Sequence, residues 1–136
     1  MTQTVKAGFI YFVLVFAAGF MLGTIRVTFL IPRFGPTTAV LVELPIILAV
    51  AWNVCGIVLR HVEVAAEFGP RLVMGTVAFV VLMLAETALA TLAFSQTIPE
   101  IAAQYSTAHG AIGLAGQAIF ASIPLLRLAA ERHARP

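Results

Sequence analysis

Charged residues are scarce in this chain, and their scarcity excludes an ordinary water-soluble fold. Only 10% of the 136 residues are Asp, Glu, Lys or Arg, and 61% are hydrophobic. A soluble domain usually carries about 25% charged residues. In water, so short a chain would lack the polar side chains to cover its surface, whereas lipid solvates an apolar exterior. The composition therefore predicts an integral membrane protein with one compact domain, residues 1–136.

Further absences narrow the possible functions. The single cysteine, Cys55, excludes an internal disulfide framework, and we expect it to be a small packing residue. His61, His109 and His133 lie at different ends of apolar runs, so neither a metal site nor another cofactor is expected. The net charge of +2 is too small to indicate nucleic-acid binding. Phosphate-binding, nucleophile-elbow and Cys-x-x-Cys motifs are missing, so enzymatic activity is not favoured.

What the chain does contain is long apolar runs. A hydrocarbon core about 30 Å thick requires about 20 apolar residues in a helix. Four stretches meet this requirement, at about 7–31, 38–59, 72–94 and 108–128. The first is longer than the apolar core of a signal peptide, so we expect a retained helix. The pattern predicts an all-α membrane protein, an up-and-down bundle of four transmembrane helices.

The links between these runs carry turn chemistry. Pro32–Thr37 contains two prolines and a glycine, which predicts a tight turn before the second helix. Arg60–Pro70 is polar enough to lie in water. Ser95–His109 is longer, and its segment Pro99–Tyr105 favours a short helix at the membrane interface.

Basic residues beside the runs predict the orientation. Four crossings place both termini and the middle link on one side of the membrane. That side would hold Lys6, Arg60, Arg71, Arg127, Arg132 and Arg135. The other side would hold only Arg26 and Arg33. Because Lys and Arg accumulate on the cytoplasmic side, we expect both termini in the cytoplasm.

Three ionisable residues lie inside the predicted spans: Arg26, Glu43 and Glu86. At about 1.5 Å per helical residue, the first two lie roughly 9 Å from the outer end of adjacent antiparallel helices, and Glu86 roughly 13 Å. We therefore expect a polar cluster in which Arg26 pairs with Glu43 and Glu86 could hold a proton. Such a cluster suits a proton relay or a site for a cationic or polar ligand. The alternatives are a structural ion pair, or an Arg26 side chain that extends to the lipid headgroups.

Other polar positions complete the candidate site. Pro45 follows Glu43 by two residues and frees a backbone carbonyl that could bind a cation or ligand, unless it is only a tolerated kink. Asn53 and Gln117 are expected to hydrogen-bond between helices or to contact a ligand. The candidate binding site therefore comprises Arg26, Glu43, Pro45, Asn53, Glu86 and Gln117.

Small residues recur at helical spacing in the first and fourth runs. Gly19 and Gly23 form a Gly-x-x-x-Gly pattern, and Gly110, Gly113 and Gly116 give the fourth run a narrow face. These patterns predict close helix packing within the monomer, with self-association as the alternative. The expected partners are the lipid bilayer and, where such a face mediates association, a second copy or a membrane partner protein.

The first half of the chain carries a family resemblance. It rests on the segments GFMLGTIR (Gly19–Arg26), PRFG (Pro32–Gly35) and VELP (Val42–Pro45). In these segments the chain resembles a family of small bacterial inner-membrane proteins of unknown function. The resemblance covers the first helical hairpin, and the remainder by hydropathy alone. It implies a four-helix fold, a bacterial origin and no known activity.

A second comparison fails at its key position. The chain is similar in length and helix number to the eicosanoid- and glutathione-metabolising membrane enzymes. Their second helix carries an Asn four residues before a Glu and a Pro three residues after it. Here the upstream position is Ala39, and Pro45 follows Glu43 by only two residues. The residue expected to contact glutathione is therefore absent.

Three functions remain open, and each makes a structural prediction. Transport or sensing of a small solute or proton predicts a water-accessible cavity that reaches Glu43 and Glu86. An accessory role in assembling a larger complex predicts a dry, closed Arg26–Glu43 pair. A lipid-active enzyme would need a cleft that opens to the bilayer beside these carboxylates.

Overall fold

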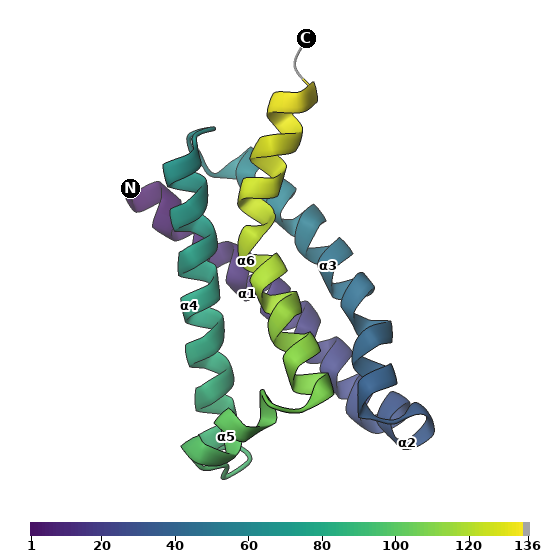
Figure 1. The fold of residues 1–136 in the computed structure, drawn as a ribbon. Coiled ribbons are helices and arrows are strands. Elements are labelled where there is room, and N and C mark those ends of the chain that lie inside the picture. Colours follow the sequence, from purple (N-terminus) through teal and green to yellow (C-terminus); the bar gives the residue numbers. More distant parts are fainter. Residues whose placement is uncertain (135–136) are drawn as a thin grey trace.

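The computed structural model describes residues 1–134 and is built of helices (Figure 1). Their bounds are α1 Thr2–Ile25, the π-helix η1 Arg26–Leu30, α2 Ile31–Phe34, α3 Pro36–His61, α4 Phe68–Leu92, α5 Ile98–Gln104 and α6 Ala108–Ala134. The first three are continuous, and with α3, α4 and α6 they make four helices long and apolar enough to cross a membrane. The protein is therefore a multi-pass membrane protein, and the predicted all-α four-helix bundle is confirmed. Arg135, one of the basic residues counted above, lies outside the described residues.

The link between the first two long helices is shorter than the predicted turn Pro32–Thr37. The helix continues through Pro32 because this residue lies in the first turn of α2, where a missing N–H is tolerated. Just before it, the N–H of Ile31 donates to the carbonyl of Arg26, which is the five-residue spacing of a π-turn. Gly35 alone reverses the chain, with a φ of +84° that favours glycine, and α3 begins at the next residue.

The other helix ends agree more closely with the sequence. The predicted short helix is confirmed as α5, whose first turn is capped by Thr97 accepting from the N–H of Glu100 at 3.3 Å. The last helix runs on to Ala134, beyond the end predicted at about residue 128.

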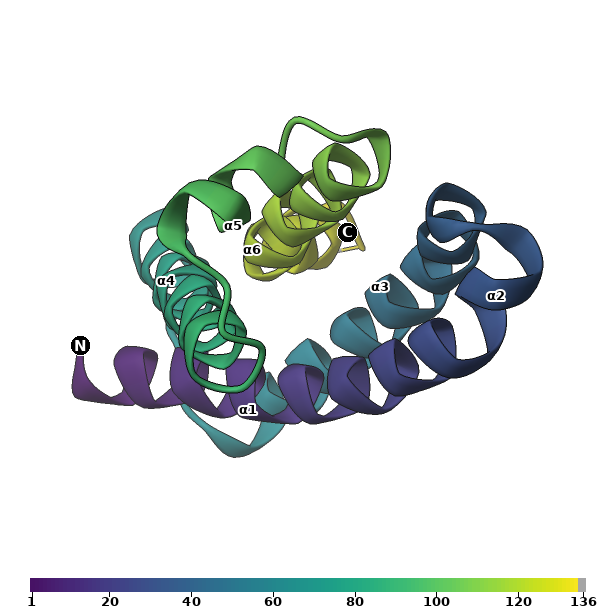
Figure 2. The ribbon, with the colours of Figure 1, turned by 90° about the horizontal axis from the view of Figure 1, so that it is seen from below.

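The four long helices form a ring whose order differs from their order in the chain. α1 packs against α3 and α4, and α6 packs against the same two helices (Figure 2). Consecutive helices α3 and α4 therefore lie opposite each other. We call the end of the bundle where α1 begins and α6 ends the terminal end. The opposite end, which holds Gly35 and α5, is the α5 end.

Glycines let helix backbones approach closely toward the terminal end. A Cβ atom on Gly8 of α1 would lie 2.7 Å from the carbonyl oxygen of Met74 on α4. A Cβ atom on Gly75 of α4 would overlap the carbonyl of Ala121 on α6. Cys55 is fully buried in this region, which confirms it as a packing residue.

Proline and tyrosine join α1 to α6 in the same core. Pro124 lies inside α6 and has no N–H, so the carbonyl of Phe120 loses its usual helical donor. The buried hydroxyl of Tyr11 on α1 donates to that carbonyl at 2.8 Å. The rings of Tyr11 and Phe120 stack with their centroids 4.6 Å apart. One side chain therefore satisfies the backbone defect and connects opposite members of the ring.

Two arginines of the terminal end turn inward. Arg71, only 3% exposed, donates to the carbonyl of Pro124 at 3.2 Å and to Glu131 at 3.1 Å. Arg127 donates to the carbonyl of Trp52 at 2.9 Å and stacks over its ring. In the sequence, Arg71 and Arg127 were interpreted only as charges that flank the spans, because hydropathy does not show which groups they hydrogen-bond.

We expect Tyr11→Phe to lower the free energy of unfolding by about 1 kcal/mol, because the carbonyl of Phe120 is left without a donor. In a Pro124→Ala background the helix regains an N–H at position 124, so the same change should cost less than half as much. Thermal unfolding in detergent of the two single variants and the double variant measures this coupling. Equal losses in both backgrounds would contradict it.

Candidate functional site

An ion pair joins the first two long helices in the half of the bundle nearest α5. Nη1 of Arg26, the first residue of η1, lies 2.5 Å from Oε2 of Glu43 on α3. The Arg26 side chain is 32% exposed and that of Glu43 is 12% exposed. The pairing predicted from their equal depth is confirmed.

A second polar contact lies on the other side of the same space. Nε2 of Gln117 on α6 donates to Oε2 of Glu86 on α4 at 2.6 Å. The expected role of Gln117 in hydrogen-bonding between helices is therefore confirmed. Within the described residues, the ion pairs involve Arg26 with Glu43 and Arg71 with Glu131. Glu86 thus has an amide partner but no ion-pair partner in that part of the chain.

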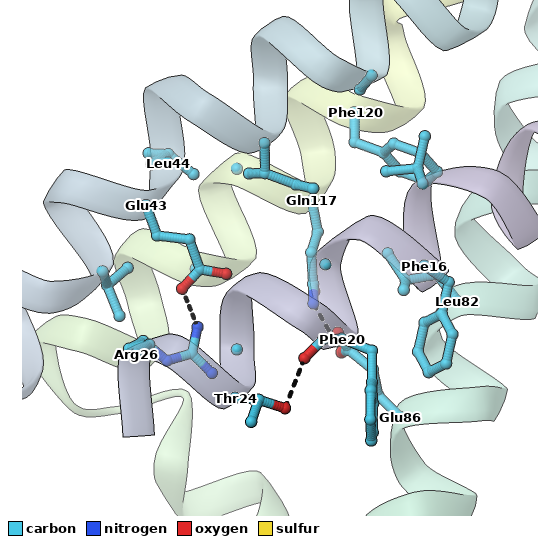
Figure 3. Close-up of a pocket in the computed structure, with 18 of the residues that line it drawn as sticks. Phe16, Phe20, Thr24, Arg26, Glu43, Leu44, Leu82, Glu86, Gln117 and Phe120 are labelled. Atoms are coloured by element: carbon cyan, nitrogen blue, oxygen red, sulfur yellow. Dashed lines mark hydrogen bonds and ion pairs between the residues drawn. The ribbon is translucent and has the colours of Figure 1, made fainter. Parts of the chain in front are cut away.

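Both contacts line one cavity of about 530 Å³ (Figure 3). Its walls come from α1, η1, α3, α4 and α6, with Phe94 after the end of α4. Most of the lining is apolar, and five aromatic side chains contribute: Phe12, Phe16, Phe20, Phe94 and Phe120. The predicted convergence of Arg26, Glu43 and Glu86 therefore takes the form of two polar contacts facing one apolar cavity.

Several glycines make room for this cavity, which corrects part of the packing prediction. The nearest atom to a Cβ on Gly19 would be 3.7 Å away, and on Gly23 3.6 Å away. A Cβ on Gly113 would meet nothing within 4 Å. These three glycines line the cavity instead of bringing helices together. Gly116 and Gly110 do pack closely, against the side chain of Leu44 and the carbonyl of Gln104.

Two predicted site residues lie elsewhere. Pro45 is exposed and does not line the cavity. Asn53 is also exposed, and its Nδ2 donates to the carbonyl of Ala49 in its own helix at 2.8 Å. It therefore neither joins helices nor contacts the cavity. The position of Pro45 follows from rotation about α3. At about 100° per residue, a residue two positions after Glu43 points to the opposite side of the helix.

The polar chemistry in reach of the cavity is limited. Thr24 and Thr28 line it, but their hydroxyls donate to the carbonyls of Phe20 and Thr24, at 2.9 and 2.7 Å. The remaining polar lining residues are Arg26, Glu43, Glu86 and Gln117. Within Met1–Ala134, no three His, Cys, Asp or Glu side chains gather closely enough to hold a metal ion.

Comparison with protein-family models, with curated proteins and with solved structures finds no match to this chain. The resemblance to small bacterial inner-membrane proteins therefore stays a prediction.

We expect Arg26→Gln and Glu43→Gln each to destabilise the protein by about 2 kcal/mol, because each leaves a charge without its partner in a largely apolar wall. The double variant removes both charges, so its loss should be clearly smaller than the sum of the two. Denaturant or thermal unfolding in detergent gives the three values. A strictly additive double variant would show that the two side chains do not stabilise each other.

Proposed function

We propose that the protein binds a small solute in this cavity, as a transporter or sensor in the inner membrane of a bacterium. The observation that carries the proposal is a cavity lined by both Glu43 and Glu86. This is the feature that the transport or sensing hypothesis requires. An accessory role would instead require a dry, closed ion pair, whereas both members of the Arg26–Glu43 pair line the cavity.

The size and lining of the cavity support binding. Pockets for small ligands generally measure about 300–1,000 Å³ and are mostly apolar, with a few polar groups that orient the ligand. A volume of about 530 Å³ falls in this range. Two polar contacts on opposite walls of an otherwise apolar space match the same pattern.

The edge of the cavity supports access for a ligand. Three apolar lining residues are more than half exposed: Phe20 at 56%, Val27 at 58% and Phe94 at 66%. The cavity therefore reaches the surface of the bundle, near the α5 end, where α1 and α4 diverge (Figure 1). A solute that enters the bilayer could reach the carboxylates without crossing the packed terminal half.

Binding is better supported than covalent chemistry. The residues described as lining the cavity include no Ser, Cys or His. The two threonine hydroxyls there are held by backbone carbonyls of their own helix. A lipid-active enzyme would therefore have only carboxylates with which to act.

The proposed orientation places both termini in the cytoplasm. The basic residues Lys6, Arg60, Arg71, Arg127 and Arg132 belong to segments at the terminal end. Arg26 is paired with Glu43 and Arg71 with Glu131, which leaves Arg33 as the flanking charge at the α5 end and Lys6, Arg60, Arg127 and Arg132 at the terminal end of the described residues. Both facts strengthen the positive-inside argument.

Cavity filling tests the proposal. In Gly113→Phe the new ring grows into open space in the cavity, so the affinity for the neutral fluorophore Nile red should fall at least about tenfold. Ala115→Phe places the same ring on an exposed position of α6 and should change the affinity less than about twofold. Nile red fluorescence is titrated in lipid nanodiscs, with protein-free nanodiscs subtracted, and thermal unfolding checks each variant. Equal affinity for Nile red in the wild type and in Gly113→Phe would contradict the proposal.

A further inference from the structure

We propose that the ligand of this cavity is an amphipathic amine, a cation with N–H donors on an apolar body. The inference rests on the proposed function and names the class of solute. Three separate features of the cavity carry it: its charge balance, its unused hydrogen-bond acceptors and its aromatic walls.

The charge balance favours a cation. Of the described residues that line the cavity, Arg26 is the one cation, while Glu43 and Glu86 are two carboxylates. Glu43 already neutralises the guanidinium at 2.5 Å. The carboxylate of Glu86 then lines a mostly apolar space with an amide as its hydrogen-bond partner and no ion-pair partner among the described residues. A charge in such surroundings is costly unless a counter-charge accompanies it, and a cationic ligand supplies one.

The hydrogen-bonding groups favour a ligand that donates. A carboxylate is an acceptor, so Gln117 presents its Nε2 to Glu86 and turns its Oε1 away. That Oε1 is buried and has no hydrogen-bond partner within the described residues. Glu86 and Gln117 therefore carry neighbouring acceptors on two helices that line the same cavity, Glu86 directly and Gln117 through an Oε1 that is covered in this arrangement. A protonated amine has two or three N–H groups, so it could donate to Glu86 and, once the Gln117 amide turns toward it, also to that Oε1.

The walls suit the rest of such a molecule. Phe16 and Phe20 line the cavity with Glu86, and Figure 3 places Phe20 on the Glu86 side. Aromatic faces attract a cation within about 6 Å of the ring centre. The remaining wall, which includes Leu44, Ile47 and Leu82, is apolar and can hold a hydrocarbon body.

An anionic amphiphile is the competing class, and the ion pair argues against it. Arg26 is the group that would attract an anion, but Glu43 occupies its Nη1. An anion would therefore meet one neutralised cation and one further carboxylate. The same pairing makes an arginine compatible with a site for a cation. Arg26 binds Glu43, and Glu86 has no ion-pair partner among the described residues and can bind the ligand.

The experiment compares four ligands with the same eight-carbon chain as competitors of Nile red in nanodiscs at pH 7. Octylamine, whose amine resembles that of Lys and is charged at this pH, should compete at least about tenfold more strongly than octanol. Octanoate should be weakest. Octyltrimethylammonium keeps the charge but has no N–H, so it should fall between octylamine and octanol.

Two variants connect the ranking to the residues. Glu86→Gln should reduce the advantage of octylamine over octanol to about twofold or less, while octanol competes as before. Gln117→Leu should reduce the advantage of octylamine over octyltrimethylammonium. Glu67→Gln removes an exposed carboxylate outside the cavity and should leave every ratio unchanged.

The wild-type ranking decides the inference even if a variant fails to fold. If Nile red binds but octanol matches octylamine, or octanoate competes best, the amine inference is overturned and the binding function stands. If Gly113→Phe leaves Nile red binding unchanged, the proposed function itself fails, whichever ligand competes best.

Discussion

The core of a bilayer contains no water to hydrogen-bond a polar group, so each such group must find its partner within the protein. Several hydrogen bonds in this fold satisfy polar groups of this kind. The hydroxyl of Tyr11 satisfies the carbonyl that Pro124 leaves free, and Arg71 joins Glu131 and a backbone carbonyl. Arg26 meets Glu43 at the start of a π-turn. These contacts connect the helices in a medium where burial of apolar surface contributes little to their association.

The two halves of the bundle use small residues in opposite ways. Near the terminal end, Gly8 and Gly75 let backbones approach until no Cβ would fit between them. Toward the α5 end, Gly19, Gly23 and Gly113 have no close neighbour and line open space. The half with close backbone packing at Gly8 and Gly75 therefore adjoins the half that contains the candidate site.

The candidate site was partly predictable, and the successes and failures have physical reasons. Depth along a helix follows from counting residues, so the meeting of Arg26 and Glu43 across a short hairpin could be inferred. The side of a helix that faces its neighbours can be predicted only when polar and apolar residues alternate with the helical period. These runs are apolar on all sides, so they do not show which side faces inward. Asn53 was therefore assigned to the interior although it faces outward. For the same reason the spacing of Gly19 and Gly23 indicated close packing although both residues line the cavity.

The sequence alone determined that four helices cross a membrane, because runs of about 20 apolar residues with few charges are stable as helices in lipid. It also determined that Arg26, Glu43 and Glu86 lie at similar depth, since rise per residue is constant. Only the tertiary structure decided the ring order, in which α1 and α6 each pack between α3 and α4. It also decided that Glu86 and Gln117 hydrogen-bond to each other on the wall of a cavity. Neighbours in a bundle depend on side-chain shape at each crossing, which hydropathy does not record.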